Sequence, residues 1–284
     1  MNRFHLHMVS DSTGETLNAI ANAALVQFAE ADAVRHLWPM IRNRAQMQLV
    51  IQSISDNPGL VWFTVVNPEL RIMLEESCRA MGVRCVPALQ PIMDSLGSIL
   101  GARTRGQPGI QHEMNKEYFD RIEAMHFTLI HDDGQHVEDL DRADIVIVGV
   151  SRTSKTPTCM YLANRGLKSA NVPYVPGVPL PPQLLKLKRP LVVGLTTASD
   201  RLSQIRRNRL LSLKESADSS YTDPDLVEEE LLEAKRVFAR NRWPTIDVTR
   251  KSIEETAAAI LSHYHRRLDR DRVAGEGADE AAPA

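Results

Sequence analysis

Cysteine is scarce in this chain of 284 residues, and long apolar runs are missing altogether. The three cysteines, Cys78, Cys85 and Cys159, form an odd set that lacks the spacing of zinc ligands. This pattern is typical of reduced thiols in a reducing compartment and argues against a disulfide framework. Since no stretch approaches about 18 uninterrupted apolar residues, a helix that spans a membrane is not expected.

A strong excess of either charge is missing too. The formal net charge is −2 with 25% charged residues, so the basic surplus typical of nucleic-acid-binding domains is absent. The first apolar run, residues 4–9, carries two histidines and does not resemble a secretory signal. We therefore expect a cytoplasmic protein that binds neither nucleic acid nor membranes.

Apolar runs and helical patterns alternate along the chain, which predicts an α/β fold. Residues 60–66 form a near-continuous apolar run typical of a buried strand, and a helix follows between Pro68 and Gly82. Further strands are expected at residues 4–9, 83–89, 127–131, 145–148, 171–175, 191–197 and 245–249. Strands that alternate with helices indicate a parallel, doubly wound sheet.

The domain boundaries follow from a glycine-rich, basic segment at residues 101–109, which is the best candidate for a linker. We expect a parallel-sheet N-terminal α/β domain at residues 1–110. A P-loop kinase-like α/β C-terminal domain that binds a nucleotide is expected at residues 111–273. Residues 274–284 consist mainly of Gly, Ala and acidic residues, and this composition predicts a disordered tail.

One strand–turn–helix junction resembles the phosphate-binding pattern G-x-x-x-x-G-K-[ST]. The β-branched run at residues 145–148 leads into Gly149, and Lys155 and Thr156 fill the last two positions of the pattern. Ser154 replaces the second glycine, which is tolerable if that residue keeps a negative φ or if the loop opens slightly.

The pattern assigns a role to each part of this loop. Its backbone amides would surround a phosphate, Lys155 would neutralise it, and Thr156 would bind Mg²⁺. The candidate nucleotide-binding residues are Gly149, Val150, Ser151, Arg152, Thr153, Ser154, Lys155 and Thr156. The alternative is an ordinary strand-to-helix turn that happens to carry Ser, Thr and Lys.

A second junction of this kind follows the first expected strand. The candidate phosphate-binding residues there are Ser10, Ser12, Thr13 and Gly14. Ser12 and Glu15 have the spacing of a helix capping box, which offers a purely structural explanation. Capping does not require Asp11, so Asp11 is a candidate for a functional role.

Two further groups of charged residues have both a structural and a functional interpretation. Asp132 and Asp133 suit a tight turn, and they also suit a metal or proton-transfer site. The helix expected at residues 200–209 carries Arg206 and Arg207, which form either a solvated basic face or a lid over a transferring phosphoryl group.

Taken together, these motifs resemble the pyruvate, phosphate dikinase regulatory protein family, which includes the phosphoenolpyruvate synthase regulatory proteins. The resemblance covers about residues 4–265, and serine at the second glycine position is usual in that family. The segments of this chain that carry the resemblance are residues 10–16, 111–114, 132–134, 149–157, 161–164, 171–173, 246–249 and 253–256.

The resemblance implies a bifunctional enzyme. One activity is a serine/threonine kinase that uses ADP to phosphorylate, and so inactivate, the dikinase. The other removes that phosphate with inorganic phosphate, releases pyrophosphate and reactivates the target. Phosphoenolpyruvate synthase is the alternative target, and a homodimer is a further expectation.

The implied chemistry allots roles to the candidate residues. Lys155, Arg206 and Arg207 would stabilise the transferring phosphoryl group, and Asp11 would act as the base for the target threonine. Thr156 would hold Mg²⁺ together with Asp132 or Asp133. A small-molecule P-loop kinase and a nucleotide-dependent binding module without catalysis remain as alternative hypotheses.

Overall fold

The computed structural model describes residues 2–109, 116–213 and 221–279. The chain forms two compact units, Met1–Glu113 and Met114–Ala284. The division falls close to the boundary expected after residue 110. Each unit contains one four-stranded sheet in which every pairing is parallel, so the predicted α/β fold with parallel sheets is confirmed.

The first unit has the strand order β2-β1-β3-β4. These strands are β1 (Asn2–Ser10), β2 (Ala31–Trp38), β3 (Gly59–Thr64) and β4 (Cys85–Pro87). The sequence did not predict β2, because this edge strand exposes Asp32 and Arg35 and therefore lacks an apolar run.

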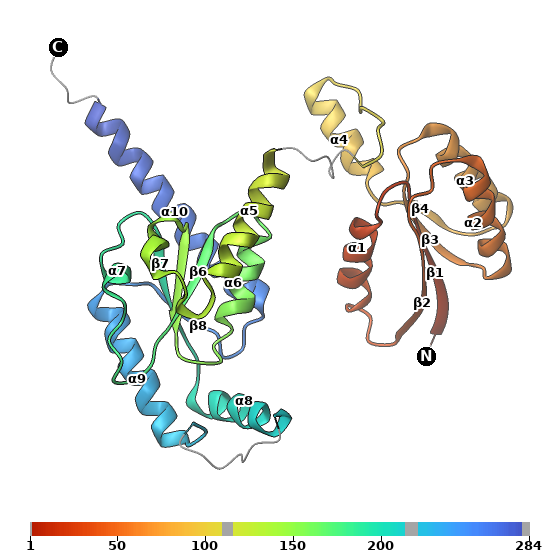
Figure 1. Ribbon diagram of the computed structural model, residues 1–284. Helices are drawn as coiled ribbons and strands as arrows, with labels where there is room; N and C mark the ends of the chain where they lie inside the picture. The colour runs from red at the N-terminus through yellow and green to blue at the C-terminus, as the bar shows by residue number, and fades with distance from the viewer. Residues whose placement is uncertain (1, 110–115, 214–220, 280–284) are drawn as a thin grey trace. The chain divides into compact units, whose positions relative to one another are not determined.

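Helices cover both faces of this first sheet (Figure 1). The helices are α1 (Glu15–Leu25), α2 (Arg44–Asp56), α3 (Pro68–Ala80) and α4 (Gln90–Leu100). Leu6 and Met8 of β1 pack against Leu17 of α1. Val9, which points to the opposite face, belongs to a core that includes Met47 of α2 and Leu74 of α3. The alternation along β1 thus separates two cores.

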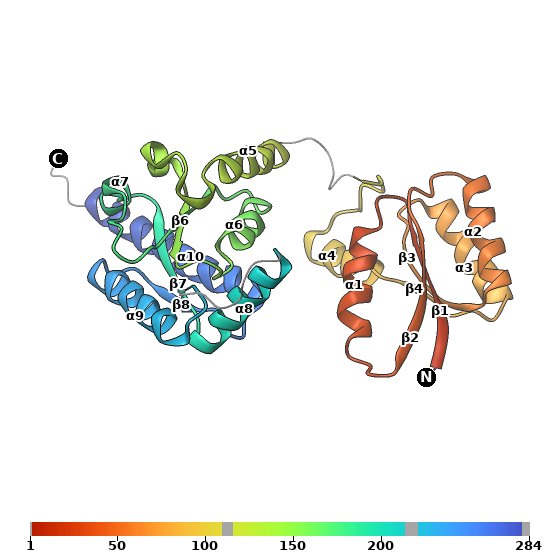
Figure 2. The same ribbon diagram turned by 60° about the horizontal axis from the view of Figure 1, so that its bottom comes forward.

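The second unit repeats this arrangement with the order β6-β5-β7-β8 (Figure 2). Its strands are β5 (Ile145–Gly149), β6 (Ser169–Pro173), β7 (Leu191–Thr196) and β8 (Thr245–Asp247). Every residue of β5 and β7 is buried, as expected for central strands that are covered on both faces.

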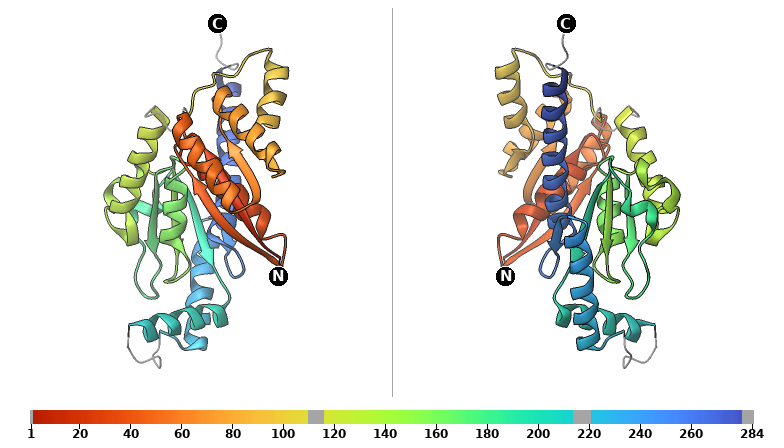
Figure 3. Two further views of the ribbon diagram at one scale, coloured as in Figure 1. Left: turned by 90° about the vertical axis from the view of Figure 1, so that its right-hand side faces the viewer. Right: turned by 90° about the vertical axis from the view of Figure 1, so that its left-hand side faces the viewer.

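Two helical layers enclose the second sheet. The helices are α5 (Lys116–Ile130), α6 (Lys155–Ala163), α7 (Pro182–Leu185), α8 (Ser199–Ser212), α9 (Pro224–Arg240) and α10 (Ile253–Asp279). Ile147 of β5 packs with Leu162 of α6 and Ile260 of α10, whereas Val148 packs on the other face with Phe238 of α9. Figures 1 and 3 show α8 beyond one end of the sheet.

Two expectations for the second unit differ from the structure. Residues 127–131 were predicted as a strand, but α5 continues to Ile130 because Ala124, Phe127 and Thr128 are buried at helical spacing. The last helix extends to Asp279, where a disordered tail had been expected from residue 274, and residues 280–284 lie outside the described part. No helix in the described ranges is long and apolar enough to cross a membrane.

Candidate functional site

The loop between β5 and α6 has the backbone of a phosphate-binding turn. A Cβ at Gly149 would lie 2.8 Å from Thr153 Oγ1 and 3.1 Å from the Leu195 carbonyl oxygen, so only glycine fits there. Thr153 Oγ1 donates a hydrogen bond to the Val150 carbonyl at 2.9 Å, which closes the turn. Ser154 has φ +59°, so the first of the two conditions under which serine is tolerable here, a negative φ, is not met.

The amino end of α6 opens into this loop. Ser154 occupies the N-cap position, and no side chain caps the helix there. The first amides of a helix have no partner inside the helix, and they carry the positive end of the helix dipole. The end of α6 is therefore suited to an anion such as phosphate.

Lys155 lies almost entirely inside this loop, with 7% of its surface exposed. Its Nζ donates a hydrogen bond to the Val150 carbonyl oxygen at 3.0 Å. Burial lowers the pKa of Lys155, and the nearby carboxylate of Asp133 opposes that shift. An anion bound in the loop would stabilise the charged ammonium group further.

Thr156 and Asp132 lie in direct contact beside the loop. Thr156 Oγ1 donates to Asp132 Oδ1 at 2.8 Å, and Asn171 Nδ2 also donates to that carboxylate oxygen. The Asp133 amide in turn donates to Asn171 Oδ1 at 3.1 Å. Asn171, in the middle of β6, therefore positions the Asp132–Gly134 turn, a role that the sequence alone did not indicate.

These oxygen atoms suit a magnesium ion. Among the described residues, no group of three or more His, Cys, Asp or Glu side chains could hold a metal ion. Magnesium in nucleotide sites is bound through one or two carboxylates, with phosphate and water oxygens as its other ligands. Asp132, Asp133 and the Thr156 hydroxyl supply such a set.

A hollow of about 450 Å³ brings these groups together. Its walls are Asp132, Asp133, Ile205 and most of residues 151–157, including Lys155 and Thr156. The structure thus places the predicted loop and the two predicted carboxylates around one space. From α8, only Ile205 lines this hollow among the residues described.

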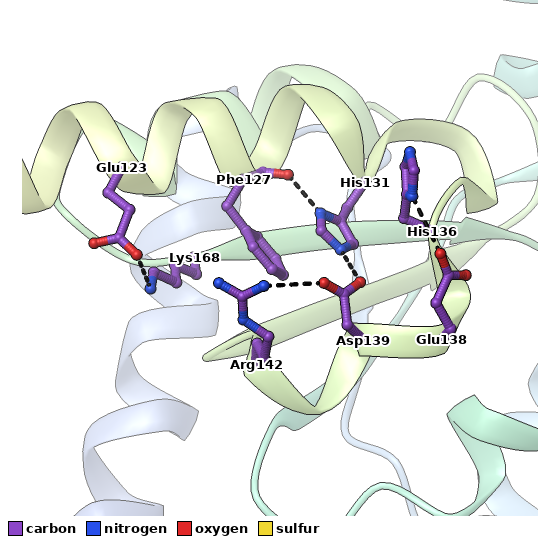
Figure 4. A network of polar contacts seen from close by, with 8 residues as sticks. All are labelled: Glu123, Phe127, His131, His136, Glu138, Asp139, Arg142 and Lys168. Atoms are coloured by element: carbon purple, nitrogen blue, oxygen red, sulfur yellow. Dashed lines mark hydrogen bonds and ion pairs between the residues drawn. The ribbon is translucent and has the colours of Figure 1, made fainter.

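A buried histidine, His131, directly precedes the two carboxylates in the chain (Figure 4). His131 is 1% exposed, and its Nδ1 bonds the Phe127 carbonyl at 2.7 Å while its Nε2 bonds Asp139 Oδ1 at 2.7 Å. The hydrogen bond from His131 is the main reason that the pKa of Asp139 is lowered. Arg142 contacts the other oxygen of Asp139 at 3.2 Å. This network fixes the end of α5 directly before Asp132.

Arg206 has a structural role that was not expected. Its Nη1 and Nη2 donate to the two carboxylate oxygens of Glu230 at 2.7 and 3.0 Å, and Arg206 is only 2% exposed. Nη2 also donates to the Ser151 carbonyl at 3.3 Å, and the guanidinium stacks over the ring of Tyr221. Arg206 therefore holds the loop between β5 and α6 against α8 and α9. Arg207 is exposed and lies outside the hollow.

The second predicted phosphate turn lies in the first unit. Ser10 Oγ accepts hydrogen bonds from the Ser12 amide at 3.1 Å and from Thr64 Oγ1 at 3.0 Å. Gly14, with φ +80°, is the N-cap of α1, and no side chain caps that helix. The capping box expected from Ser12 and Glu15 is therefore wrong.

Asp11 is buried beside this turn, with 3% of its surface exposed. Its Oδ2 accepts a hydrogen bond from the Val66 amide at 2.7 Å. Burial raises the pKa of Asp11, and the amide bonds partly oppose the shift. Ser10, Asp11, Ser12 and Gly14 line a cavity of about 200 Å³ within the first unit, whereas the Lys155 loop belongs to the second unit.

Both hollows occupy the position where ligands bind in doubly wound sheets. Each lies outside the carboxyl ends of the strands. One follows β1 and β3, where the chain order of the first sheet reverses. The other follows β5 and lies between the Asp132–Gly134 turn beside β6 and helix α8, which follows β7. The shared strand order therefore places one hollow at the same edge of each sheet.

Comparison with known proteins adds independent information. The sequence model of the kinase/pyrophosphorylase family matches residues 6–261. The chain is 55% identical to a protein of Erythrobacter litoralis over 94% of this chain and 96% of that protein. It is 51% identical to a protein of Novosphingobium aromaticivorans over 100% of both chains. Both relatives carry the provisional name of pyruvate, phosphate dikinase regulatory protein.

Proposed function

Because this chain belongs to the kinase/pyrophosphorylase family, we propose that it is a bifunctional regulator of pyruvate, phosphate dikinase. The observation that carries the proposal is the hollow in which Lys155, Thr156, Asp132 and the uncapped end of α6 converge. A phosphate that enters this hollow meets backbone amides, one ammonium group and a carboxylate–hydroxyl pair.

In the inactivating direction the nucleotide donor is ADP. The threonine oxygen of the target attacks the β-phosphorus, the bond from that phosphorus to the bridging oxygen breaks, and AMP leaves. Lys155 and the loop amides stabilise the charge on the phosphate oxygens. Asp11 is the proposed base for the threonine proton, because a raised pKa makes its carboxylate a stronger base.

In the activating direction inorganic phosphate is the acceptor. One of its oxygens attacks the phosphorus of phosphothreonine, the threonine oxygen leaves with a proton, and pyrophosphate is released. Thr156, Asp132 and Asp133 would hold Mg²⁺, which neutralises phosphate charge when bound. The turn at Ser10, Ser12, Thr13 and Gly14 is a second candidate site for inorganic phosphate.

The enzyme would work in the cytoplasm on a protein substrate, as a homodimer. Arg207, which is exposed on α8 and does not line the hollow, has its proposed role at the transferring group from the family resemblance alone. Arg206 would contribute indirectly, through the loop that it supports.

The test incubates the purified chain with Mg²⁺ and the dikinase, with either ADP or ATP as the donor. Mass spectrometry should find phosphothreonine with ADP, and inorganic phosphate should remove it with release of pyrophosphate. A parallel reaction with phosphoenolpyruvate synthase identifies the target. Labelling with ATP alone, or labelling of a free metabolite, would contradict the proposal.

A further inference from the structure

A second hollow lies along the same edge of the second sheet. It measures about 690 Å³ and is formed by the start of α8 and by the segment between β8 and α10. Because β5, β7 and β8 are successive parallel neighbours, their carboxyl ends meet at this edge. The Lys155 hollow follows β5, and the second hollow follows β7 and β8.

Helix α8 connects the two hollows. Arg201, Gln204 and Ile205 have helical spacing of three and four residues, so they share one face of α8. Ile205 lines the Lys155 hollow, whereas Arg201 and Gln204 line the second one. Arg201 and Ile205 are separated by about one helical turn, or about 5.4 Å along the axis of α8. A single extended ligand can therefore reach both hollows.

The wall opposite α8 is held in a fixed shape. The Thr249 amide and Thr249 Oγ1 both donate to Asp247 Oδ1, at 2.8 and 2.5 Å. The Ala198 amide, directly before α8, donates to Thr249 Oγ1 at 2.8 Å. The two bonds from Thr249 lower the pKa of Asp247, and the bond from the Thr249 hydroxyl is the main cause. The loop after β8 is therefore tied to the start of α8.

The side chains of this hollow suit a nucleoside. Within the described ranges neither Arg201 nor Arg250 has a hydrogen-bond or ion-pair partner, and both are exposed. Free guanidinium groups stack on nucleobases, a contact that tolerates different bases. The Gln204 amide and the Asp200 carboxylate add donors and acceptors for base edges and ribose hydroxyls.

The two reactions proposed above differ in one chemical respect. In the kinase direction the phosphoryl group leaves an oxygen of AMP, and in the reverse route it moves to an oxygen of inorganic phosphate. AMP and inorganic phosphate thus play the same part in the transfer, and they differ only by the nucleoside.

We infer that the second hollow binds the nucleoside of ADP and AMP, so that the kinase uses both hollows and phosphorolysis uses the Lys155 hollow alone. This inference rests on the proposed function and divides its two activities between two sets of residues. Arg201 and Arg250 are then determinants of the nucleotide reaction and not of the phosphate reaction.

The test is a variant that combines Arg201→Ala with Arg250→Ala. Its dissociation constant for ADP should rise about tenfold or more, because two charge-bearing contacts are lost. Its dissociation constant for pyrophosphate should change by less than about twofold. Kinase kcat/KM should fall in step with ADP affinity, and phosphorolysis should fall far less.

Two matched variants serve as controls. Arg240→Ala removes an exposed arginine of α9 outside the hollow and should leave both affinities unchanged. Lys155→Ala should weaken the binding of ADP and pyrophosphate together. Circular dichroism of each variant verifies that the chain is folded.

Three results would overturn the inference. An equal loss of ADP and pyrophosphate affinity would show a general anion site. A raised KM for the protein target with unchanged ADP affinity would show a docking site for that target. Failure of the unmodified chain to bind either ligand would refute the proposed function as well as the inference.

Discussion

Replacing Glu230 by alanine would leave the Arg206 guanidinium buried without its counter-charge. The Arg206 side chain is 2% exposed and that of Glu230 is 14% exposed, so water cannot replace the lost carboxylate. Removing one partner of a buried ion pair costs about 3–5 kcal/mol. Since Glu230 is partly accessible, we expect a value near the lower end, about 3 kcal/mol.

Thermal unfolding measures this cost directly. For a unit of this size, about 3 kcal/mol corresponds to a lowering of Tm by about 6–12 °C. The double replacement Arg206→Met with Glu230→Leu should recover much of the loss, because two apolar side chains of similar volume need no counter-charge. Glu228→Ala, an exposed position on the same helix, is the control and should change Tm little.

The same variants separate two roles of Arg206. If it supports the loop through the Ser151 carbonyl, the double variant should bind ADP more weakly but still transfer phosphate. If Arg206 instead contacts the phosphoryl group, the double variant would be folded and catalytically dead. The reasoning fails if Glu230→Ala unfolds within about 1 °C of the unmodified chain, since that implies well under 1 kcal/mol.

Three further outcomes can be measured. Lys155→Ala should abolish the heat of ADP binding in calorimetry with Mg²⁺, and a normal titration would exclude the loop as the nucleotide site. The pKa values of His7 and His36 are lowered, mainly by burial, so the unfolded chain takes up protons first as pH falls. In denaturant titrations the stability contributed by these histidines should be complete above about pH 6.5 and should be lost below it. A gain in stability on acidification would contradict the burial argument. In Gly194→Ala, the new Cβ would lie 2.3 Å from Phe238 Cδ2. The free energy of unfolding should fall by about 1–3 kcal/mol, and an unchanged value would mean that the Phe238 ring moves aside without cost.

The sequence predicted the Lys155 loop because its signals are local. An apolar β-branched run, a glycine and a Lys-Thr pair stand next to one another in the chain, and each constrains only its neighbours. The strand predicted at residues 145–148 is confirmed as β5. The placement of Asp132 beside Thr156 could only be proposed, because a contact between residues so far apart depends on the path of the sheet.

The features that were missed depend on distant partners. Arg206 looked like one of several exposed basic residues, and only its pairing with Glu230 on another helix reveals that it is buried. Asn171 stood in a segment that resembles the family, but as a polar residue at the start of an expected strand it gave no sign of its contact with Asp132. Residues 127–131 were assigned to a strand because short apolar runs do not distinguish a strand from the end of a buried helix.

The left-handed φ angles of Arg152 and Ser154 have a wider consequence. Alternation between right-handed and left-handed residues curls a backbone so that successive amides point to one centre, which binds anions without help from side chains. In such a curl the side chains of the loop point away from that centre, so natural selection can vary them while the amides still bind an anion. A motif search that insists on glycine at position 154 would overlook phosphate-binding proteins that reach the same curl with serine.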